Sequence, residues 1–354
     1  MHDITSEIES IASELVEWEK KISSAAKVLK EKNKAFGKMF LEENLFSKVN
    51  SFDGGNITVG GIDGGLLKKE YHGVNIILTR AVCAVFTYQN MKISNSEYYP
   101  LSFQKPNIKV INSSFNDSDF MSVASIERLK SELGLACDML GEDIDLLLLD
   151  GSVMLHPSVR VDKGSSHRID YDHLVDTTKK MYLLSFKNSV PLAGIVEDSR
   201  SQTFVKGCCS ILDSVTMKDL ENVRDTHFLT HCLSVGERTS IFRTVDTGDK
   251  VPAEINGFEN NLFSFYIRPS EFDRALRIDF VAGDDPVALG SRIASAVFSM
   301  SRHNSVYGIP PVIIDADQRA KLSGEELLFV EREIKKRTGN LSSFSELRRN
   351  SRPI

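Results

Sequence analysis

The amino-acid sequence predicts an α/β protein in which a mixed sheet is flanked by helices and preceded by a long N-terminal helix. Three successive segments rich in Val, Ile, Phe and Tyr have short connections, as in an antiparallel meander. After them, segments with helical and strand-like apolar spacing alternate along the chain. Two of the strongly apolar segments also end in Asp followed by Gly, which places a carboxylate at the end of each predicted strand.

Residues 3–36 are predicted to form one long helix. Apolar residues recur in alternating steps of four and three, which is an unbroken heptad seam, at Ile4, Ile8, Ile11, Leu15, Trp18, Ile22, Ala25 and Leu29. The seam predicts a coiled-coil-like contact, either within the chain or with a second chain. A long helix lying across its own domain is the alternative.

The predicted core begins with a strand at 57–63, which runs into the glycine-rich segment 61–65. Glycines that bound an apolar run predict a tight corner, and they let the backbone approach whatever Asp63 holds. Strands at 74–88 and 91–99 complete the meander. A helix from the N-capping segment 116–120 to about residue 141 follows, and then a strand at 144–150 that ends in Asp150 and Gly151.

A polar loop at 151–168, a helix at 171–187 and a strand at 191–196 complete the order β-β-β-α-β-α-β. This order is that of a ribonuclease-H-like sheet, in which the first and fourth strands are neighbours. The sequence therefore predicts that Asp63 and Asp150 come together. Asp-Gly after a strand is also ordinary turn chemistry, so a purely structural role is the alternative.

Residues 201–260 interrupt the order with a polar, mixed pattern and are predicted to be an insertion. Strands at 262–268 and 275–281 follow, and Asp285 before Pro286 is a typical start for the next helix, which runs to about 303. A last helix begins at Ser323, and the tail is basic. We therefore expect an N-terminal helical region at 1–50, a core at 51–200, the insertion at 201–260, and a segment at 261–354 that completes the core.

Composition excludes some classes of protein. The net charge of −6 provides no global basic field, so a nucleic acid would have to be bound by a local patch. Five cysteines are an odd number, and without a CxxC motif they indicate reduced thiols. The acidic, amphipathic N-terminus and the absence of a long apolar run predict neither a signal peptide nor a membrane span. We expect a cytoplasmic protein with no membrane partner.

Carboxylates that converge on one site repel one another unless a divalent cation lies between them, and oxygen ligands suit Mg²⁺ and Mn²⁺. Two such ions about 4 Å apart can activate water and stabilise the leaving oxygen of a phosphodiester. The helix before the second Asp strand offers Glu127 and Glu132 as a third carboxylate. Glu132 is preferred because it lies between apolar residues on the chain, and Asp198 is a further candidate.

Four short motifs occur in order along the chain: GIDGG at 61–65, LLLLDGS at 146–152, GIVEDSRS at 194–201 and YGIPPVIIDADQRAKL at 307–322. Together they resemble the NurA nucleases over roughly residues 55–325. The resemblance implies a ribonuclease-H-like fold, a toroidal homodimer and Mn²⁺-dependent cleavage of DNA, with 5′→3′ exonuclease action and endonuclease action on single strands. It also implies a role in DNA end resection during double-strand break repair, with the hexameric ATP-driven translocase HerA as partner.

The resemblance also implies roles for single residues. Asp63 and Asp150 match the metal ligands at the strand ends, Glu132 matches a helical Glu, and Tyr307 matches a tyrosine near the scissile phosphate. Asp317 stands where many family members have His. Since Asp also binds cations through oxygen, the preferred ion is expected to shift toward Mg²⁺. The expected catalytic residues are these five, and the four carboxylates among them are the expected metal ligands.

Basic residues near the expected site are candidates for contacts to backbone phosphates, which supply most sequence-independent affinity for DNA. These candidates are Lys68, Arg160, Lys163, Arg168, Arg200 and Lys206. Each one taken alone has an ordinary surface charge as its alternative.

A second metal site has a weaker signal. His227, His231 and Cys232, with Cys208 and Cys209 upstream, invite a zinc interpretation. Adjacent cysteines make poor tetrahedral ligands, however, and helical His pairs with this spacing are common.

Two rival functions compete with a nuclease. A catalytically weak or inactive regulatory subunit of a translocase would tolerate the departure at Asp317. An actin-like ATP phosphotransferase also places Asp-Gly turns after its first strands, but it needs a second phosphate loop and an adenosine motif, and residues 201–354 contain neither.

Overall fold

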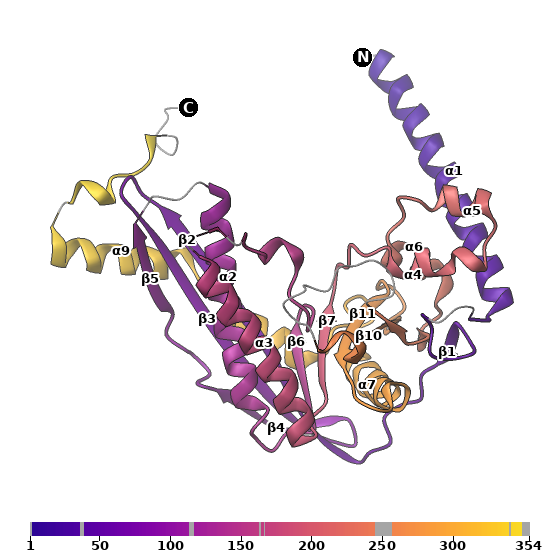
Figure 1. Cartoon of the computed structure of the whole chain (residues 1–354). Helices are drawn as coiled ribbons and strands as arrows, with labels where there is room; N and C mark the ends of the chain where they lie inside the picture. The colour runs from indigo at the N-terminus through magenta and orange to yellow at the C-terminus, as the bar shows by residue number, and fades with distance from the viewer. Residues whose placement is uncertain are drawn as a thin grey trace. The chain divides into compact units, whose positions relative to one another are not determined.

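The computed structural model describes residues 2–35, 39–112, 117–162, 164–165, 167–244, 257–339 and 341–348 (Figure 1). The chain folds into two compact units, and each is assembled from separate stretches of sequence. The first unit comprises Met1–Gly55, Gly151–Val153 and Ala193–Pro310, and the second comprises Asn56–Asp150, Met154–Leu192 and Pro311–Ile354. Both units combine helices with strands, so the predicted α/β class is confirmed.

The second unit is built on the long antiparallel pair β2 (Asn56–Glu70) and β3 (Val74–Gln89). Two further strands, β4 (Lys92–Tyr99) and β5 (Asn107–Asn112), pair antiparallel with different parts of β3. β6 (Leu146–Asp150) pairs parallel with β2. The order β6-β2-β3-β4 confirms the meander and the predicted neighbourhood of the first and fourth strands, whereas β5 was not predicted.

The prediction of a tight corner at residues 61–65 is wrong. β2 continues through these glycines to Glu70 and pairs with β3 along its whole length, so Asp63 lies inside the strand and not at its end. The glycines do not form a turn; they allow a helix to pack closely against β2. A Cβ atom on Gly65 would lie 2.0 Å from the carbonyl oxygen of Ala320, at the end of α8 (Pro311–Ala320).

Helices cover both faces of this group of strands. Ile77 of β3 packs with Phe120 and Val123 of α2 (Asp117–Met139), while its neighbour Ile76 packs with Val330 of α9 (Gly324–Thr338). Because successive side chains on a strand point to opposite faces, α2 and α9 lie on opposite faces of β3 (Figure 1). A second helix, α3 (Arg168–Asn188), packs beside α2. The predicted N-cap at Asn116 lies outside the described residues.

The first unit has its own strands. β10 (Leu262–Ile267) and β11 (Leu276–Val281) form an antiparallel pair, and β7 (Leu192–Val196) pairs antiparallel with β11. β8 (Glu237–Thr239) pairs with both β10 and β1 (Phe46–Lys48), and β9 (Phe242–Arg243) pairs with β10. α7 (Pro286–Ser301) packs near β10, and the Asp285 side chain accepts a hydrogen bond from the Ala288 backbone N–H, as predicted for its N-cap.

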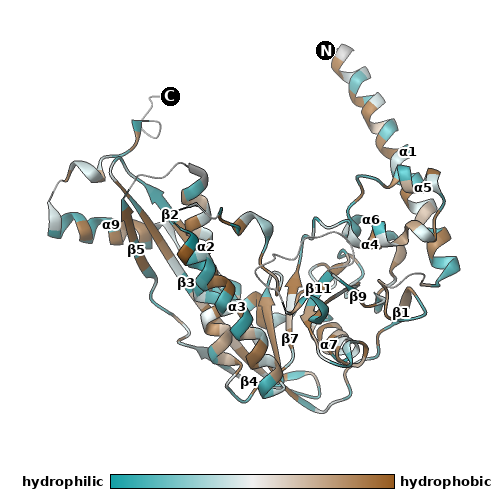
Figure 2. Cartoon of the chain, viewed as in Figure 1, coloured by the Kyte–Doolittle hydropathy of each residue, from teal (hydrophilic) through white to brown (hydrophobic). Residues whose placement is uncertain are grey.

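The N-terminal helix α1 (His2–Lys32) has two different halves. In its second half, Ile22, Ala25 and Leu29 are buried in the core of the first unit. In its first half, apolar residues recur among polar ones along the helix (Figure 2), and the side chains of Ile4, Ile8, Ile11 and Leu15 are at least half exposed. The predicted seam is therefore an internal contact over its second half, and its first half has no cover from the described part of the chain.

The residues predicted as an insertion contribute short helices to the first unit. They are α4 (Thr203–Gly207), α5 (Ser214–Asp219) and α6 (Asp225–Cys232), together with the 3₁₀ turn η2 (Cys208–Ser210). Other 3₁₀ turns are η1 (Pro157–Val159), η5 (Glu259–Asn261) and η6 (Ser342–Phe344). All five cysteines are free, and no helix in the described ranges has the length and hydropathy that a bilayer span needs.

Candidate metal centre

Four carboxyl groups from four elements of the second unit form a cluster whose members interact electrostatically. Asp63 lies on β2, Asp150 ends β6, Glu132 lies on α2 and Asp317 lies on α8. The parallel register pairs Ile62 with Leu149, so the next position on each strand holds an aspartate, and Asp150 is close enough to Asp63 to influence its pKa. The predicted meeting of the two aspartates is confirmed.

Glu132 reaches the aspartates from α2, through a gap left by a glycine. A Cβ atom on Gly64 would lie 2.1 Å from Oε1 of Glu132, so the position next to Asp63 has to be free of a side chain for the glutamate to adopt this position. Gly64 and Gly65 point to opposite faces of β2, toward α2 and α8 respectively. The glycine segment therefore lets two helices bring acidic residues close to one strand.

Burial and mutual repulsion raise the pKa values of the two innermost carboxyls. Burial is the main cause for Asp63, and the charge of Asp317 adds to it, while the Gly64 N–H and Arg128 oppose the rise. Burial raises the pKa of Glu132 to about 8; Arg128 opposes this rise, and the charges of Asp63 and Asp150 reinforce it. A positive charge placed close to these carboxyls would therefore stabilise their ionised forms.

Arg128 supplies part of that charge and was missed by the sequence analysis. It precedes Glu132 by one helical turn, and its Nη1 lies 2.7 Å from Oε1 of Glu132 and 3.4 Å from the carbonyl oxygen of Gly64. The signal that could have found it is the spacing of four residues, which brings two side chains together on one face of a helix.

The donor set fits a hard divalent cation such as Mn²⁺ or Mg²⁺. All four side chains offer oxygen, the atom that these ions prefer. Oε1 of Glu132 is buried and forms no hydrogen bond, although it is ion-paired with Arg128. In the described ranges no three of these carboxylates have oxygens that all lie within 4.8 Å of one another, so binding a cation would require side-chain rotation.

The other acidic and aromatic candidates lie in different surroundings. Glu127 is ion-paired with Lys109 and Lys130 at 2.8 and 3.1 Å, so Glu132 and not Glu127 lies beside the aspartates. Asp198 belongs to the first unit, where it is ion-paired with Arg274 at 2.9 Å. Tyr307 also belongs to the first unit, and its hydroxyl donates a hydrogen bond to Glu197 at 2.8 Å.

The predicted DNA-contacting residues divide between the units. In the second unit, Arg160 is exposed, and Nζ of Lys68 lies over the Phe120 ring and contacts Sδ of Met121. Arg168 pairs with Asp172 at 2.8 Å and donates to a backbone carbonyl, so it stabilises the start of α3.

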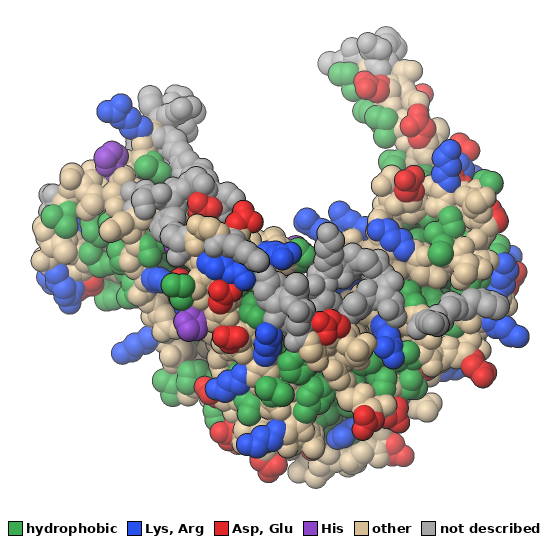
Figure 3. Space-filling model, in the orientation of Figure 1, with side chains coloured by type: hydrophobic (Ala, Val, Ile, Leu, Met, Phe, Trp, Pro, Cys, Tyr) green, Lys and Arg blue, Asp and Glu red, His purple; other side chains and the backbone are tan. Residues whose placement is uncertain are grey.

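Arg200 and Lys206 are exposed in the first unit, and Lys163 lies outside the described residues. On the face drawn in Figure 3, basic side chains are interspersed with acidic ones, which agrees with the absence of a global basic field.

Comparisons with known proteins identify one matching family and several solved structures that are similar in fold. The family model described as NurA domain matches residues 57–322. Among solved structures, the NurA nuclease from Sulfolobus solfataricus has 14% sequence identity and a TM-score of 0.62, with 96% of this chain and 99% of that chain covered. No curated protein matches the sequence.

Two further solved structures are similar in fold. A NurA structure bound to dAMP and manganese has 11% identity and a TM-score of 0.51, with 94% of this chain and 97% of that chain covered. Another NurA structure has 10% identity and a TM-score of 0.52, with coverage of 95% and 98%. These similarities confirm the ribonuclease-H-like fold that the strand order predicts.

Proposed function

The chain belongs to the NurA domain family, and on that premise we propose that it is a divalent-metal-dependent deoxyribonuclease. One observation carries the proposal most strongly. Carboxylates far apart in the sequence come together in the second unit: Asp63 and Asp150 occupy neighbouring positions on two paired strands, and Glu132 reaches the same place across Gly64. Buried carboxylates that repel one another cost free energy, and a divalent cation bound between them would offset that cost.

Each residue has a distinct part in this proposal. Asp63 and Asp150 would hold a cation from two adjacent strands, and Glu132 would hold it from α2. Asp317 is exposed, so it would complete the site on the side open to substrate. When bound, Mn²⁺ or Mg²⁺ would supply activation of water and stabilisation of charge on the phosphodiester. Arg128 would keep the Glu132 carboxylate oriented through their ion pair.

The finer assignments follow the family resemblance. We propose 5′→3′ exonuclease action and single-strand endonuclease action in DNA end resection, with Tyr307 near the scissile phosphate. Manganese as the cofactor is supported by the similar structure that binds dAMP and manganese. Asp317 in place of His favours Mg²⁺ more than in relatives, because it replaces a nitrogen donor with oxygen.

The proposed partners are DNA, a second copy of the chain and a HerA-type hexameric translocase. DNA would be bound through phosphate contacts from exposed basic residues such as Arg160, Arg200 and Lys206, and the first half of α1 would contact the second copy. A cytoplasmic location is part of the same proposal and rests on the five free cysteines. The rival functions are a regulatory subunit without catalysis and, with less support, an ATP phosphotransferase.

Degradation of labelled single-stranded DNA by the purified full chain tests the catalytic assignment. We expect activity with Mn²⁺ or Mg²⁺ and none with a chelator, and we expect Asp63→Ala to lower the rate by at least ~100-fold because it removes a metal ligand. Glu127→Gln is the matched control, since Glu127 pairs with Lys109 of β5 and Lys130 of α2 and should retain activity within about twofold.

Equal degradation by wild type and Asp63→Ala would contradict the assignment. Absence of activity in both, with and without a translocase, would favour the regulatory subunit. Tight ATP binding by the isolated chain would favour the phosphotransferase.

A further inference from the structure

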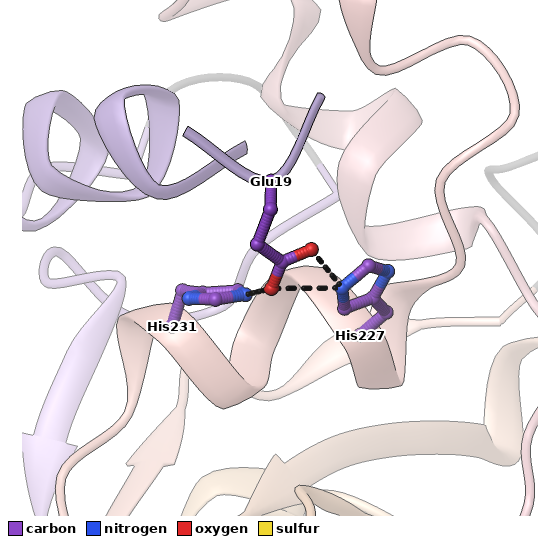
Figure 4. A group of neighbouring side chains, drawn as sticks. All are labelled: Glu19, His227 and His231. Carbon is purple, nitrogen blue, oxygen red and sulfur yellow. Dashed lines mark hydrogen bonds and ion pairs between the residues drawn. The ribbon is translucent and has the colours of Figure 1, made fainter. Parts of the chain in front are cut away.

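A second group of ligand-type side chains lies in the first unit and shares no residue with the carboxylate cluster. His227 and His231 are four residues apart on α6 and therefore share one face of the helix, and Glu19 approaches them from α1 (Figure 4). Nε2 of His227 lies 3.1 Å from Oε2 of Glu19, and Nε2 of His231 lies 2.8 Å from Oε1. The three ligand atoms all lie within 4.8 Å of one another.

The orientation of the imidazoles is fixed by their neighbours. Trp18 packs edge-on against His227, with ring centroids 5.3 Å apart, and the two histidine rings lie 5.6 Å from each other. On the other side of α6, Phe228, Leu229 and Cys232 are buried in the core of the unit and anchor the helix there. The site is thus built on two packed helices and not on a loop.

The donor set differs in chemistry from the carboxylate cluster. Two imidazole nitrogens and one carboxylate oxygen suit Zn²⁺ and similar transition metals, whereas Mg²⁺ prefers oxygen alone. Three protein ligands with a remaining open position are the arrangement found in catalytic zinc sites, while structural sites have four. Cys208 and Cys232, which the sequence offered as zinc ligands, are buried among apolar side chains, so the third ligand here is Glu19.

The three ligands open onto a cavity of about 720 Å³. Its lining includes Arg200, Arg224 and Arg274, and Asp198 is ion-paired with the last of these. Guanidinium groups beside a metal favour an anion, because they bind phosphate or carboxylate oxygens in pairs. The cavity therefore favours a phosphate-type anion next to the metal position.

We propose that Glu19, His227 and His231 form a zinc-class metal site that links α1 to α6 and leaves one coordination position for an anion in the arginine-lined cavity. The metal position is independent of the proposed nuclease site, since none of its three ligands takes part in the carboxylate cluster, while Arg200 of the cavity is also a proposed DNA contact. The alternative is that both imidazoles only donate hydrogen bonds to the carboxylate, and in that case the group binds no metal.

Calorimetric titration of the metal-free full chain with Zn²⁺ tests the site. The titrations use the Asp63→Ala variant, in which the carboxylate cluster is disabled, and we expect this variant to bind one Zn²⁺. Adding Glu19→Gln or His231→Gln should abolish this binding or weaken it at least ~10-fold. Glu17→Gln in the same background is the matched control, because it changes a neighbouring exposed carboxylate of α1 and should keep the affinity. Circular dichroism establishes that each variant is folded, and Glu19→Gln preserves the shape of the side chain.

Cobalt provides a readout that does not depend on heat or activity. Co²⁺ bound to the Asp63→Ala protein should give the visible absorption of a four-coordinate nitrogen and oxygen site, and inorganic phosphate should change that spectrum. The metal site would be overturned if Glu19→Gln left the zinc affinity of the Asp63→Ala protein unchanged, or if the Asp63→Ala protein bound no zinc. A Co²⁺ spectrum that phosphate leaves unchanged would overturn the open position.

Discussion

Glu132 has the most informative environment of any single residue in the carboxylate cluster. It is buried beside two aspartates, and it is ion-paired with Arg128. The pKa near 8 means that in the metal-free chain Glu132 carries a proton at neutral pH. Binding of a divalent cation would displace this proton, so metal affinity is coupled to pH.

This coupling predicts how the stability of the metal-free protein depends on pH. The pKa of Glu132 is about 8 in the folded chain and near 4.5 when unfolded, so the folded state binds the proton more tightly between these values. Its contribution to stability is complete below pH 4.5 and is lost as the pH rises through 8, by up to about 1.4 kcal/mol per pH unit.

Glu132→Gln should remove most of that dependence, because the amide mimics the protonated acid. Urea unfolding with a chelator at pH 6 and pH 8 measures it, and Glu127→Gln should behave as wild type. The same slope for Glu132→Gln and wild type would show that Glu132 is not the titrating group.

At the scale of elements, β2 shows what the sequence could and could not predict. Its apolar run, the meander that follows and the parallel neighbour β6 all follow from alternation and element order. The continuation of β2 through its glycines could not be predicted from the sequence, because Gly is common both in turns and where another element packs closely. Contacts with Glu132 and Ala320 decide between the two, and these residues are distant in sequence.

The same limit applies to the choice of site residues. Glu132 was preferred over Glu127 because of its apolar neighbours, and it does lie at the cluster. Glu19 could not be connected with His227 and His231 from the sequence, because about 200 residues separate them and only the packing of α1 on α6 brings them together.

The exposed half of α1 predicts a contact with a second copy of the chain. Its apolar residues continue a seam whose other half is already buried, and apolar side chains that recur on one helix face are typical of helix–helix contacts. Replacing Ile8 and Ile11 together by Glu should weaken dimerisation by at least about 100-fold, since each buried Ile contributes about 1.5–3 kcal/mol.

Light scattering over a range of concentrations measures the mass of the particles. Ser13→Glu is the control, because it adds a charge on the face of α1 opposite the seam and should leave the dimer intact. A wild-type chain that is monomeric at all concentrations, or a double variant that stays dimeric, would rule out this contact.

At the scale of the whole molecule, the two units carry the two proposed metal sites, which differ in chemistry. The second unit holds an all-oxygen cluster that suits Mn²⁺ or Mg²⁺, and the first holds a nitrogen-rich group that suits Zn²⁺. Element order predicted that Asp63 and Asp150 meet, because they lie on neighbouring strands of a recognisable sheet, whereas Glu132 and Asp317 were expected from the family resemblance. The nitrogen-rich group depends on tertiary packing alone.

Anomalous diffraction from crystals of the full chain soaked with Mn²⁺ tests the central claim most directly. The account predicts a strong manganese peak in contact with the carboxylates of Asp63, Glu132, Asp150 and Asp317, and no peak there in Asp150→Asn crystals. A wild-type map with manganese only at Glu19, His227 and His231, or with none in the second unit, would contradict it.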